Sequence, residues 1–323
     1  MKAIQVDGEQ LVWSDAPEPM LGVGEVRIAV HATAINRADL VQRSGGYPAP
    51  PGASPILGLE CAGEVLEVGE GVTRVQTGDA VCALLAGGGY AEQVVVPAGQ
   101  VLKVPKGLDT IQAAALPEVF ATAYLNLYME ADTQPGERVL LHAGASGVGT
   151  AAIQLCRAFH NPCFVTVGSA DKIARCVALG ADGGVDRHQG EFAAAVRQWS
   201  GERGVDVILD PVGGAYLAQN LGCLGLGGCL VLIGLMGGAQ AEINLGALMM
   251  KRIRVIGSTL RARPVAQKAQ VMDALKARVW PLIESGAIQP IVEQVLPIQE
   301  ADAAHRLVAG NDTVGKVVLS VGR

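Results

Sequence analysis

Aromatic side chains are scarce in this chain, at 4% of its 323 residues, and charged side chains make up only 17%. Hydrophobic residues account for 50%, and glycine alone occupies 42 positions. This much apolar sequence excludes intrinsic disorder and is enough for packed cores in two domains. The many small residues and tight turns favour an α/β enzyme with short connections.

Other absences narrow the class of partner. The chain has no long basic run and a formal net charge of −6, so we expect no nucleic-acid partner. It has no uninterrupted apolar run of about 18 residues, so we expect no membrane-spanning helix. None of the 7 cysteines forms a CxxC pair, which predicts reduced, buried thiols in a cytoplasmic protein.

The pattern of strands and helices changes along the chain. Short runs rich in Val, Ile and Ala, separated by Gly and Pro, predict strands at 25–36, 57–69, 79–84 and 90–97. From residue 138 onward, apolar strands alternate with helical stretches, which implies βαβ units in a doubly wound parallel sheet. The strands expected there are 138–143, 163–168, 205–210, 228–235 and 253–260, and the helices begin near Gly147 or cover 169–180 and 213–225.

The C-terminal part returns to a mixed pattern. One amphipathic helix is expected at 264–286, and the tail ends in a strand-like segment at 315–321. The middle of the chain therefore predicts one α/β domain, and the β-rich N-terminal part joins the C-terminal tail in a second. The cleft between two such domains is the default place for chemistry.

The stretch RVLLHAGASGVGTAAIQLCRAF, residues 138–159, indicates a buried strand, a glycine-rich turn and an apolar helix. Gly144 and Gly149 fill the first and last glycine positions of the dinucleotide pattern G-x-G-x-x-G, and Ser146 replaces the middle one. A serine hydroxyl can bond to phosphate, and the helix N-terminus adds free N–H groups and a positive dipole end. The residues expected at the pyrophosphate are Gly144, Ala145, Ser146, Gly147, Val148 and Gly149. A glycine-rich turn without a ligand is the alternative.

The end of the second strand of this domain predicts which dinucleotide binds. NAD-binding domains carry an acid there, about 20 residues after the glycines, for the ribose 2′-hydroxyl. Here the strand ends in glycine and Ser169, which can donate to a 2′-phosphate, while Lys172 can oppose its charge. Arg187, after the third strand, can reach the same place. These residues predict NADPH, and Asp171 as the acid one register late is the alternative.

Taken together, five stretches of the chain resemble the medium-chain dehydrogenase/reductase superfamily, in its zinc-independent quinone oxidoreductase branch. They are 34–65, 78–97, 142–155, 234–238 and 258–263. The chain is most similar to the tumour-suppressor-induced quinone oxidoreductases, which also have serine in the fingerprint turn. The resemblance implies a β-rich GroES-like catalytic domain (1–118 and 262–323), a Rossmann domain (119–261) and a homodimer with its contact edge near 228–260.

Zinc ligands are missing at the positions where zinc-dependent relatives have them. Asn36 stands in place of a cysteine, and Leu59 stands in place of the histidine of a G-H-E segment. Catalytic zinc needs three such ligands and an open position. We therefore expect no metal and, without a Lewis acid to polarise an alcohol, no alcohol oxidation.

The resemblance also implies roles for residues in the catalytic cleft. Asn36 and Tyr47 would line it near the nicotinamide, and the Tyr47 phenol would donate to a substrate carbonyl. For Tyr47, a plain aromatic in a proline-rich loop is the alternative. Thr122 would begin the helix that leads into the cofactor domain and contact the nicotinamide.

Two later segments would complete the cofactor site. Gly234 and Leu235 would end a central strand, where parallel sheets bind ligands. Ser258, Leu260 and Arg261 would close over the cofactor, and for Arg261 a surface charge is the alternative.

The function expected first is NADPH-dependent reduction of a small quinone. A quinone is already a strong acceptor, so the protein mainly has to place it and stabilise developing oxyanion charge. The alternatives are reduction of the C=C bond of an enone or enoyl substrate, and a non-catalytic NADPH-binding protein. The sequence indicates no proton donor, which leaves water as a source.

Overall fold

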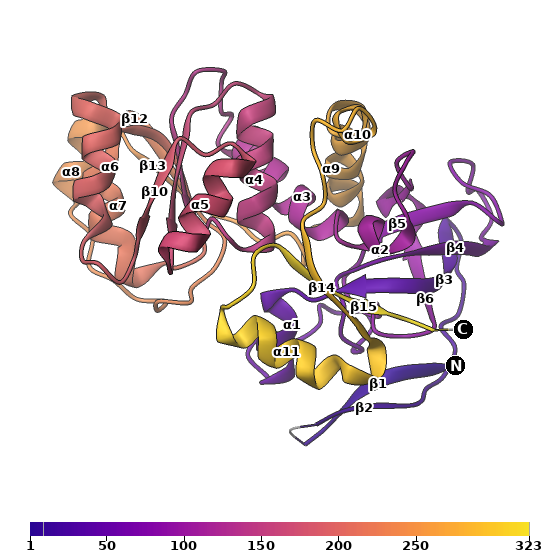
Figure 1. Ribbon diagram of the computed structural model, residues 1–323. Helices are drawn as coiled ribbons and strands as arrows, with labels where there is room; N and C mark the ends of the chain where they lie inside the picture. Colours follow the sequence, from indigo (N-terminus) through magenta and orange to yellow (C-terminus); the bar gives the residue numbers. More distant parts are fainter. Residues whose placement is uncertain (9, 323) are drawn as a thin grey trace. The chain divides into compact units, whose positions relative to one another are not determined.

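The computed structural model describes residues 1–8 and 10–322. The chain divides into two compact units. Unit 1 comprises Met1–Ala121 and Leu260–Arg323, and unit 2 comprises Thr122–Thr259. Both chain ends therefore build one unit, and the middle of the chain builds the other (Figure 1).

Unit 2 is a six-stranded sheet in the order β10-β9-β8-β11-β12-β13, and every neighbouring pair is parallel. The strands are β8 (Val139–His142), β9 (Cys163–Val167), β10 (Gly183–Asp186), β11 (Val205–Asp210), β12 (Leu224–Leu232) and β13 (Arg254–Gly257). The helices are α4 (Gly147–Ala158), α5 (Ala170–Leu179), α6 (Phe192–Ser200), α7 (Leu217–Cys223) and α8 (Leu245–Lys251). Figure 1 shows α4 and α5 on one side of the sheet and α6, α7 and α8 on the other, which confirms the doubly wound sheet.

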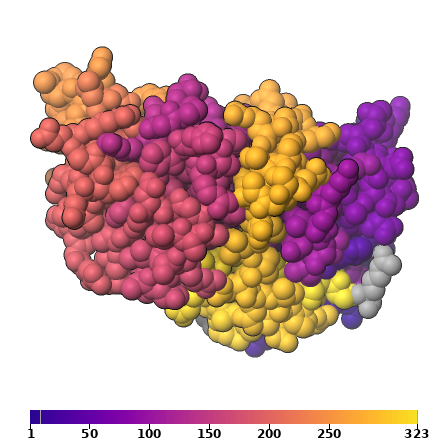
Figure 2. Space-filling model, turned by 45° about the horizontal axis from the view of Figure 1, so that its top comes forward, coloured from indigo at the N-terminus to yellow at the C-terminus, as the bar shows by residue number. Residues whose placement is uncertain are grey.

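The central strands of this sheet are apolar on both faces because helices cover both. All residues of β8 and β9 are buried, with no alternation of polar and apolar positions. The strand order reverses between β8 and β11, which is the switch point where doubly wound sheets bind ligands at the carboxyl ends of their strands. The segment around α8, light orange in Figure 2, lies at the surface of this unit.

Unit 1 contains a seven-stranded sheet in the order β14-β15-β3-β4-β5-β7, with β6 paired to β3, and a separate β1-β2 hairpin. Its strands are β1 (Lys2–Asp7), β2 (Gln10–Asp15), β3 (Glu25–Ala34), β4 (Glu60–Val68), β5 (Ala80–Leu84), β6 (Gln93–Pro97), β7 (Val101–Lys103), β14 (Val292–Pro297) and β15 (Lys316–Ser320). Its helices are α1 (Arg37–Arg43), α2 (Thr110–Ala114), α9 (Val265–Arg278), α10 (Trp280–Glu284) and α11 (Ala301–Gly310), and α3 (Pro117–Tyr124) runs across the unit boundary. The C-terminal strand β15 pairs with β3, so the tail completes the sheet that the N-terminal part begins.

The single helix expected at 264–286 is wrong, because the structure has two helices there. Val279 donates the last hydrogen bond of α9, to Leu275, and α10 then starts at Trp280. Pro281 has no backbone N–H to continue the ladder of α9, so it is placed in the first turn of a new helix instead.

Over the residues described, no helix combines the length and apolar character needed to cross a membrane. The seven cysteines are buried and free, as their spacing predicts.

Candidate active site

The glycine-rich turn at residues 143–149 joins β8 to α4, and its geometry requires glycine at two positions. A Cβ on Gly144 would lie 2.6 Å from the Cβ of Val165, and a Cβ on Gly149 would lie 2.4 Å from the carbonyl oxygen of Gly144. Both contacts are shorter than any side chain tolerates, so strand and helix pack closely only because these positions are glycine. The turn itself passes through Ala143, whose φ is +53°.

Ser146, at the middle position, is the N-cap of α4. Its Oγ accepts a hydrogen bond from the Gly149 N–H at 3.1 Å, and its own hydroxyl hydrogen stays available as a donor. The N–H groups of Gly147 and Val148 have no acceptor within the helix, since they belong to its first turn. A glycine at this position would let a ligand come closer to the backbone. Serine instead caps α4 and adds a hydroxyl donor at a helix N-terminus, a place that suits an anion.

The end of β9 repeats this arrangement. Ser169 caps α5 by accepting from the Lys172 N–H at 3.3 Å. Arg187, which directly follows β10, donates its backbone N–H to Val167 at 2.8 Å. Its guanidinium carbon lies 3.4 Å from the point where a Cβ on Gly168 would stand. The structure thus brings the exposed Arg187 beside the Ser169 cap at one edge of the sheet, whereas Asp171 lies exposed in the first turn of α5.

A buried polar network lies beneath this edge. His142 Nδ1 is 2.9 Å from Thr166 Oγ1, and its Nε2 is 2.7 Å from Asn220 Oδ1. Asn220 donates in turn to Asp210 at 2.9 Å, and Asp210 accepts from two backbone N–H groups of the loop that follows β11. Burial lowers the pKa of His142 to about 4. His142 is therefore a neutral structural residue that joins β8, β9 and β11 at their carboxyl ends.

Three further predicted cofactor residues in unit 2 follow the carboxyl ends of β12 and β13. A Cβ on Gly234 would lie 2.8 Å from the Pro211 carbonyl oxygen, and Leu235 is half-exposed. Ser258 is buried, and its N–H donates to the Leu232 carbonyl at 2.9 Å. Because all these strands are parallel, these residues lie at the same edge of the sheet as the two serine caps.

The helix start that the family resemblance implies for Thr122 is wrong. Thr122 lies inside α3, where its carbonyl accepts from the side chain of Asn126 at 2.7 Å. The helix starts earlier because Pro117 is favoured in a first turn, where its missing N–H has no partner to lose.

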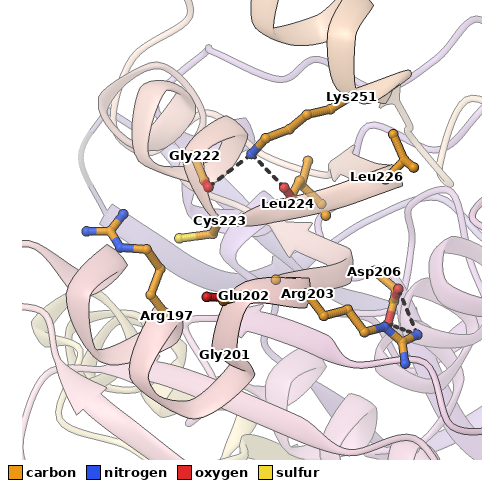
Figure 3. A pocket seen from close by; sticks show the side chains of 12 residues that line it. Arg197, Gly201, Glu202, Arg203, Asp206, Gly222, Cys223, Leu224, Leu226 and Lys251 are labelled. Carbon is orange, nitrogen blue, oxygen red and sulfur yellow. Dashed lines mark hydrogen bonds and ion pairs between the residues drawn. The ribbon is translucent and has the colours of Figure 1, made fainter.

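The opposite edge of this sheet carries a surface groove of about 570 Å³ (Figure 3). It lies at the amino ends of β11 and β12, and its charged side chains are mostly engaged with the protein. Lys251 donates to three backbone carbonyls at the end of α7, and Arg203 pairs with Asp206 at 3.0 Å. Lys251 and Arg203 in this groove are therefore already paired with groups of the protein.

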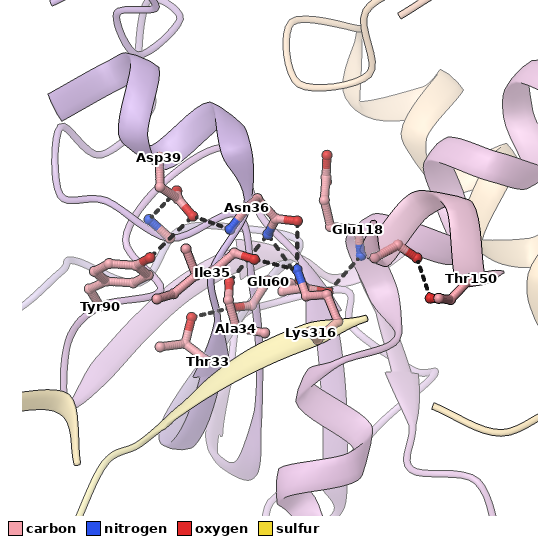
Figure 4. Close-up of polar contacts among 12 residues, drawn as sticks. Thr33, Ala34, Ile35, Asn36, Asp39, Glu60, Tyr90, Glu118, Thr150 and Lys316 are labelled. Atoms are coloured by element: carbon pink, nitrogen blue, oxygen red, sulfur yellow. Dashed lines mark hydrogen bonds and ion pairs between the residues drawn. The ribbon is translucent and has the colours of Figure 1, made fainter. Parts of the chain in front are cut away.

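In unit 1, Asn36 belongs to a buried polar cluster (Figure 4). Lys316 and Glu60 form an ion pair at 2.8 Å, and their side chains are 4% and 0% exposed. Asn36 bridges them, because its Nδ2 donates to Glu60 Oε1 at 2.9 Å and its Oδ1 accepts from Lys316 Nζ at 2.7 Å. Its second Nδ2 hydrogen goes to the Ala34 carbonyl at 3.2 Å. Asn36 therefore has no donor left and can offer a ligand only an acceptor.

This cluster occupies the segment where zinc-dependent relatives carry ligands. Leu59 is buried, and the neighbouring Glu60 is paired with a lysine instead of facing an ion. Among residues 1–8 and 10–322, no three His, Cys, Asp or Glu side chains are grouped so that they could hold a metal.

A second group of buried polar side chains, Asp39, Tyr90 and His305, connects α1 to α11. Asp39 accepts hydrogen bonds from the Asn36 N–H at 2.8 Å, from the Gly58 N–H at 3.1 Å and from the Tyr90 hydroxyl at 3.2 Å. Burial raises the pKa of Asp39 to about 6. The Tyr90 hydroxyl also lies 3.1 Å from His305 Nε2, so α1 and α11 are linked through these three side chains.

Tyr47 lies half-buried in the proline-rich loop after α1, under the guanidinium of Arg261. The guanidinium carbon is 5.2 Å from the centre of the Tyr47 ring, within the range of a cation–π contact. Burial and the charge of Glu118 raise the pKa of the Tyr47 phenol, and Arg261 opposes that rise. Arg261 is 3% exposed, so the alternative of a plain surface charge is wrong for it; Leu260 beside it is also buried.

Sequence reasoning missed several buried polar groups that shape both units. These are Asp39, Glu60, Tyr90, Asp210, Asn220, Lys268, His305 and Lys316. Lys316 left a visible signal, since it is the one charge at the head of the apolar strand KVVLS. Glu60 left none, because Glu64 and Glu67 lie in the same strand, ECAGEVLEV. A buried charge needs a partner of opposite sign. The sequence does not indicate this pair, because β4 and β15 are not neighbours in the sheet and β3 lies between them.

Two family models match the chain. "Alcohol dehydrogenase GroES-like domain" matches residues 22–106, and "Zinc-binding dehydrogenase" matches residues 147–277. Among curated relatives, the synaptic vesicle membrane protein VAT-1 homolog of Homo sapiens is 30% identical over 95% of this chain and 81% of its own length. A 2-haloacrylate reductase of Burkholderia sp is 30% identical over 96% of this chain and 95% of its own.

Solved structures of oxidoreductases have the same fold over nearly the whole chain. The quinone oxidoreductase of Escherichia coli, complexed with NADPH, superposes with a TM-score of 0.86 at 29% identity over 99% of both chains. The JamJ enoyl reductase superposes with a TM-score of 0.88 at 26% identity, also over 99% of both chains.

Proposed function

Because the chain belongs to the medium-chain dehydrogenase/reductase superfamily, we propose that it reduces a small quinone with NADPH as the electron donor. The observation that carries the proposal is the carboxyl edge of the unit 2 sheet. Two helices, α4 and α5, begin there at serine N-caps beside Arg187, and Gly144 and Gly149 let β8 and α4 pack closely enough to form the turn between them. This edge suits a ligand with two anionic groups, a pyrophosphate and a 2′-phosphate.

The choice of NADPH over NADH depends on the end of β9. A 2′-phosphate gains a hydroxyl donor from Ser169 and a charge partner from Arg187, with Lys172 in the same turn. The solved quinone oxidoreductase with the same fold contains NADPH, which supports this choice. Asp171 favours NADH instead, since a carboxylate can accept a hydrogen bond from a ribose 2′-hydroxyl. Comparing turnover with NADPH and NADH tests which cofactor is preferred.

NADPH, when bound, supplies the hydride. The protein's part is to orient the acceptor and to stabilise the negative charge that develops on its oxygen. Tyr47 is suited to this role, because its hydroxyl has no hydrogen-bond partner among the described residues and can donate. Asn36 is not, since its amide hydrogens are already used by Glu60 and Ala34. Asn36 instead fixes the start of α1, which carries the Tyr47 loop.

A second candidate is reduction of a C=C bond conjugated to a carbonyl. The similarity to a 2-haloacrylate reductase and to an enoyl reductase favours it. The same phenol donor at Tyr47 would serve an enone oxygen. The two reactions differ in where the hydride goes, so the choice of acceptor separates them.

The test is oxidation of NADPH and of NADH by the purified protein with 1,2-quinones, 1,4-quinones and a small enone, with and without a chelator. We expect chelator-resistant turnover that prefers NADPH and quinones. Turnover with the enone alone would move the assignment to alkene reduction. Tight NADPH binding without turnover of any acceptor would make the chain a binding protein.

We also propose a homodimer in the cytoplasm. β13 is an edge strand of the unit 2 sheet, and Val255 on it is 40% exposed. On α8, Leu245, Met249 and Met250 are 68%, 71% and 75% exposed. An open strand edge beside exposed apolar side chains suits pairing with a second copy. Light scattering after size-exclusion chromatography tests it, since Val255→Lys should shift a dimer to the mass of one chain.

A further inference from the structure

Arg261 connects three separate segments of unit 1. Its Nε donates to the Ala86 carbonyl at 2.8 Å, in the loop after β5. One Nη donates to the Tyr47 carbonyl at 3.2 Å, and the other donates to Gln42 Oε1 at 2.7 Å, in the last turn of α1. Three of its five N–H groups are therefore committed inside the unit, in a fork that lysine cannot reproduce.

The loop that carries Tyr47 depends on these contacts. It runs through Gly45 and Gly52, both at positive φ, and is rich in proline, so it forms no ladder with a neighbouring strand. Among the described residues, one hydrogen bond joins residues 47–52 to a part of the chain other than this loop and α1, and it is the bond that Arg261 donates to the Tyr47 carbonyl. The stacked guanidinium holds the ring as well as the backbone.

Gln42 and the backbone of Arg261 are each held in place by a further hydrogen bond. Gln42 uses its Nε2 to donate to the Pro55 carbonyl at 2.9 Å, which orients its Oε1 toward Arg261. Lys268, 5% exposed in the first turn of α9, donates to the Arg261 carbonyl at 3.2 Å. The buried guanidinium is thus fixed from the backbone side and from the loop side.

From this geometry we propose that Arg261 is a positioning residue of the acceptor site, which holds the Tyr47 phenol in place, and that its side chain does not bind the cofactor. The inference rests on the proposed donor role of Tyr47 and deepens it. It also replaces the role that family resemblance implies for this side chain. Arg261 acts through Tyr47, and the consequences of losing it should disappear when Tyr47 has no hydroxyl.

The kinetic test uses Arg261→Lys, which keeps the charge but loses the fork. We expect kcat/KM for the quinone to fall roughly tenfold, with the KM for NADPH changed less than about twofold. In a Tyr47→Phe background, the same substitution should change kcat/KM less than about twofold. A rise in the KM for NADPH that matches the loss would overturn the proposal, and so would full additivity of the two substitutions.

The pH profile gives a readout that a merely structural role would not move. Because Arg261 opposes the rise in the pKa of the Tyr47 phenol, Arg261→Gln should shift the alkaline limb of kcat/KM to higher pH. Gln42→Ala, which removes one acceptor of the fork and leaves the arginine in place, should lower kcat/KM in the same direction by a smaller factor. An unshifted limb in Arg261→Gln, or a wild-type rate in Gln42→Ala, would contradict the proposal.

Hydrogen–deuterium exchange separates this inference from the proposed reaction, since it needs no turnover. Arg261→Lys should speed exchange of residues 44–54 at least about threefold, with β3 and β4 unchanged. Unchanged exchange in the loop overturns the positioning role, whatever the acceptor is. Faster exchange in the loop, combined with full quinone turnover by Tyr47→Phe, would support the positioning role while refuting the donor role of Tyr47.

Discussion

Replacing Arg187 with alanine should change the cofactor preference without changing the reaction. A hydrogen bond to a charged group contributes about 1.5–3 kcal/mol. Arg187 is exposed and therefore screened by solvent, so the lower half of that range, about 1.5–2 kcal/mol, is appropriate. At 1.4 kcal/mol per factor of ten, the KM for NADPH should rise roughly 10–30-fold. NADH lacks the 2′-phosphate, so its KM should change less than about twofold.

Initial rates over a range of each cofactor, at fixed quinone and fixed ionic strength, measure both values. Arg197→Ala is the matched control, because Arg197 is also an exposed arginine of unit 2 but lines the groove at the amino ends of the strands. It should leave both KM values within about twofold of the wild type. An equal rise for NADPH and NADH in Arg187→Ala, or no rise for either, would refute the reasoning.

Four further predictions concern stability and metal. Lys316→Met leaves the Glu60 carboxylate buried without its ion-pair partner, so the free energy of unfolding in urea should fall by about 3–5 kcal/mol. Adding Glu60→Gln to Lys316→Met should recover most of that loss, and an equal loss in the single and double variants would contradict the prediction. Gly149→Ala places a Cβ 2.4 Å from a carbonyl oxygen and should cost at least about 2 kcal/mol and weaken NADPH binding, whereas Gly222→Ala, with nothing within 4 Å, should be close to neutral. Burial lowers the pKa of His142 to about 4, against 6.5 for an ordinary histidine, so between these values the unfolded chain binds a proton that the folded chain does not. The contribution of neutral His142 to stability is therefore complete above pH 6.5 and should fall by roughly 3 kcal/mol as the pH drops to 4. His142→Gln should remove this dependence of the unfolding free energy on pH. Prolonged dialysis against a chelator should leave quinone turnover unchanged, and a loss restored by zinc would contradict the account.

The sequence predicts unit 2 well because its signals are local. The central parallel strands are continuous apolar runs, and the two helices that follow the first two of them, α4 and α5, begin at serine caps within the next few residues. The strands at 163–168 and 205–210 and the helix at 169–180 are observed within one residue of the expected bounds. The helix at 264–286 fails, because Pro281 stops the hydrogen-bond ladder without interrupting the amphipathic pattern. The start of a helix at Thr122 fails as well, and α6 and α8 were not expected.

The candidate site in unit 1 is harder to predict because its contacts join distant parts of the chain. Glu60 and Lys316 are 256 positions apart, and Arg261 reaches back to Tyr47, 214 positions earlier. Periodicity and spacing carry no information on such pairs. Family resemblance indicated that Asn36, Tyr47 and Arg261 matter, but only the contacts separate a hydroxyl that can donate from an amide already in use and a guanidinium that holds a loop.

The most direct test of the central claim is single-turnover oxidation of NADPH deuterated at C4, mixed with the protein and then with a 1,2-quinone or an enone. The account predicts rapid loss of the reduced cofactor with the quinone, slowed by the deuterium label, and a much slower reaction with the enone. Cofactor that stays reduced with the quinone, although bound, would contradict it.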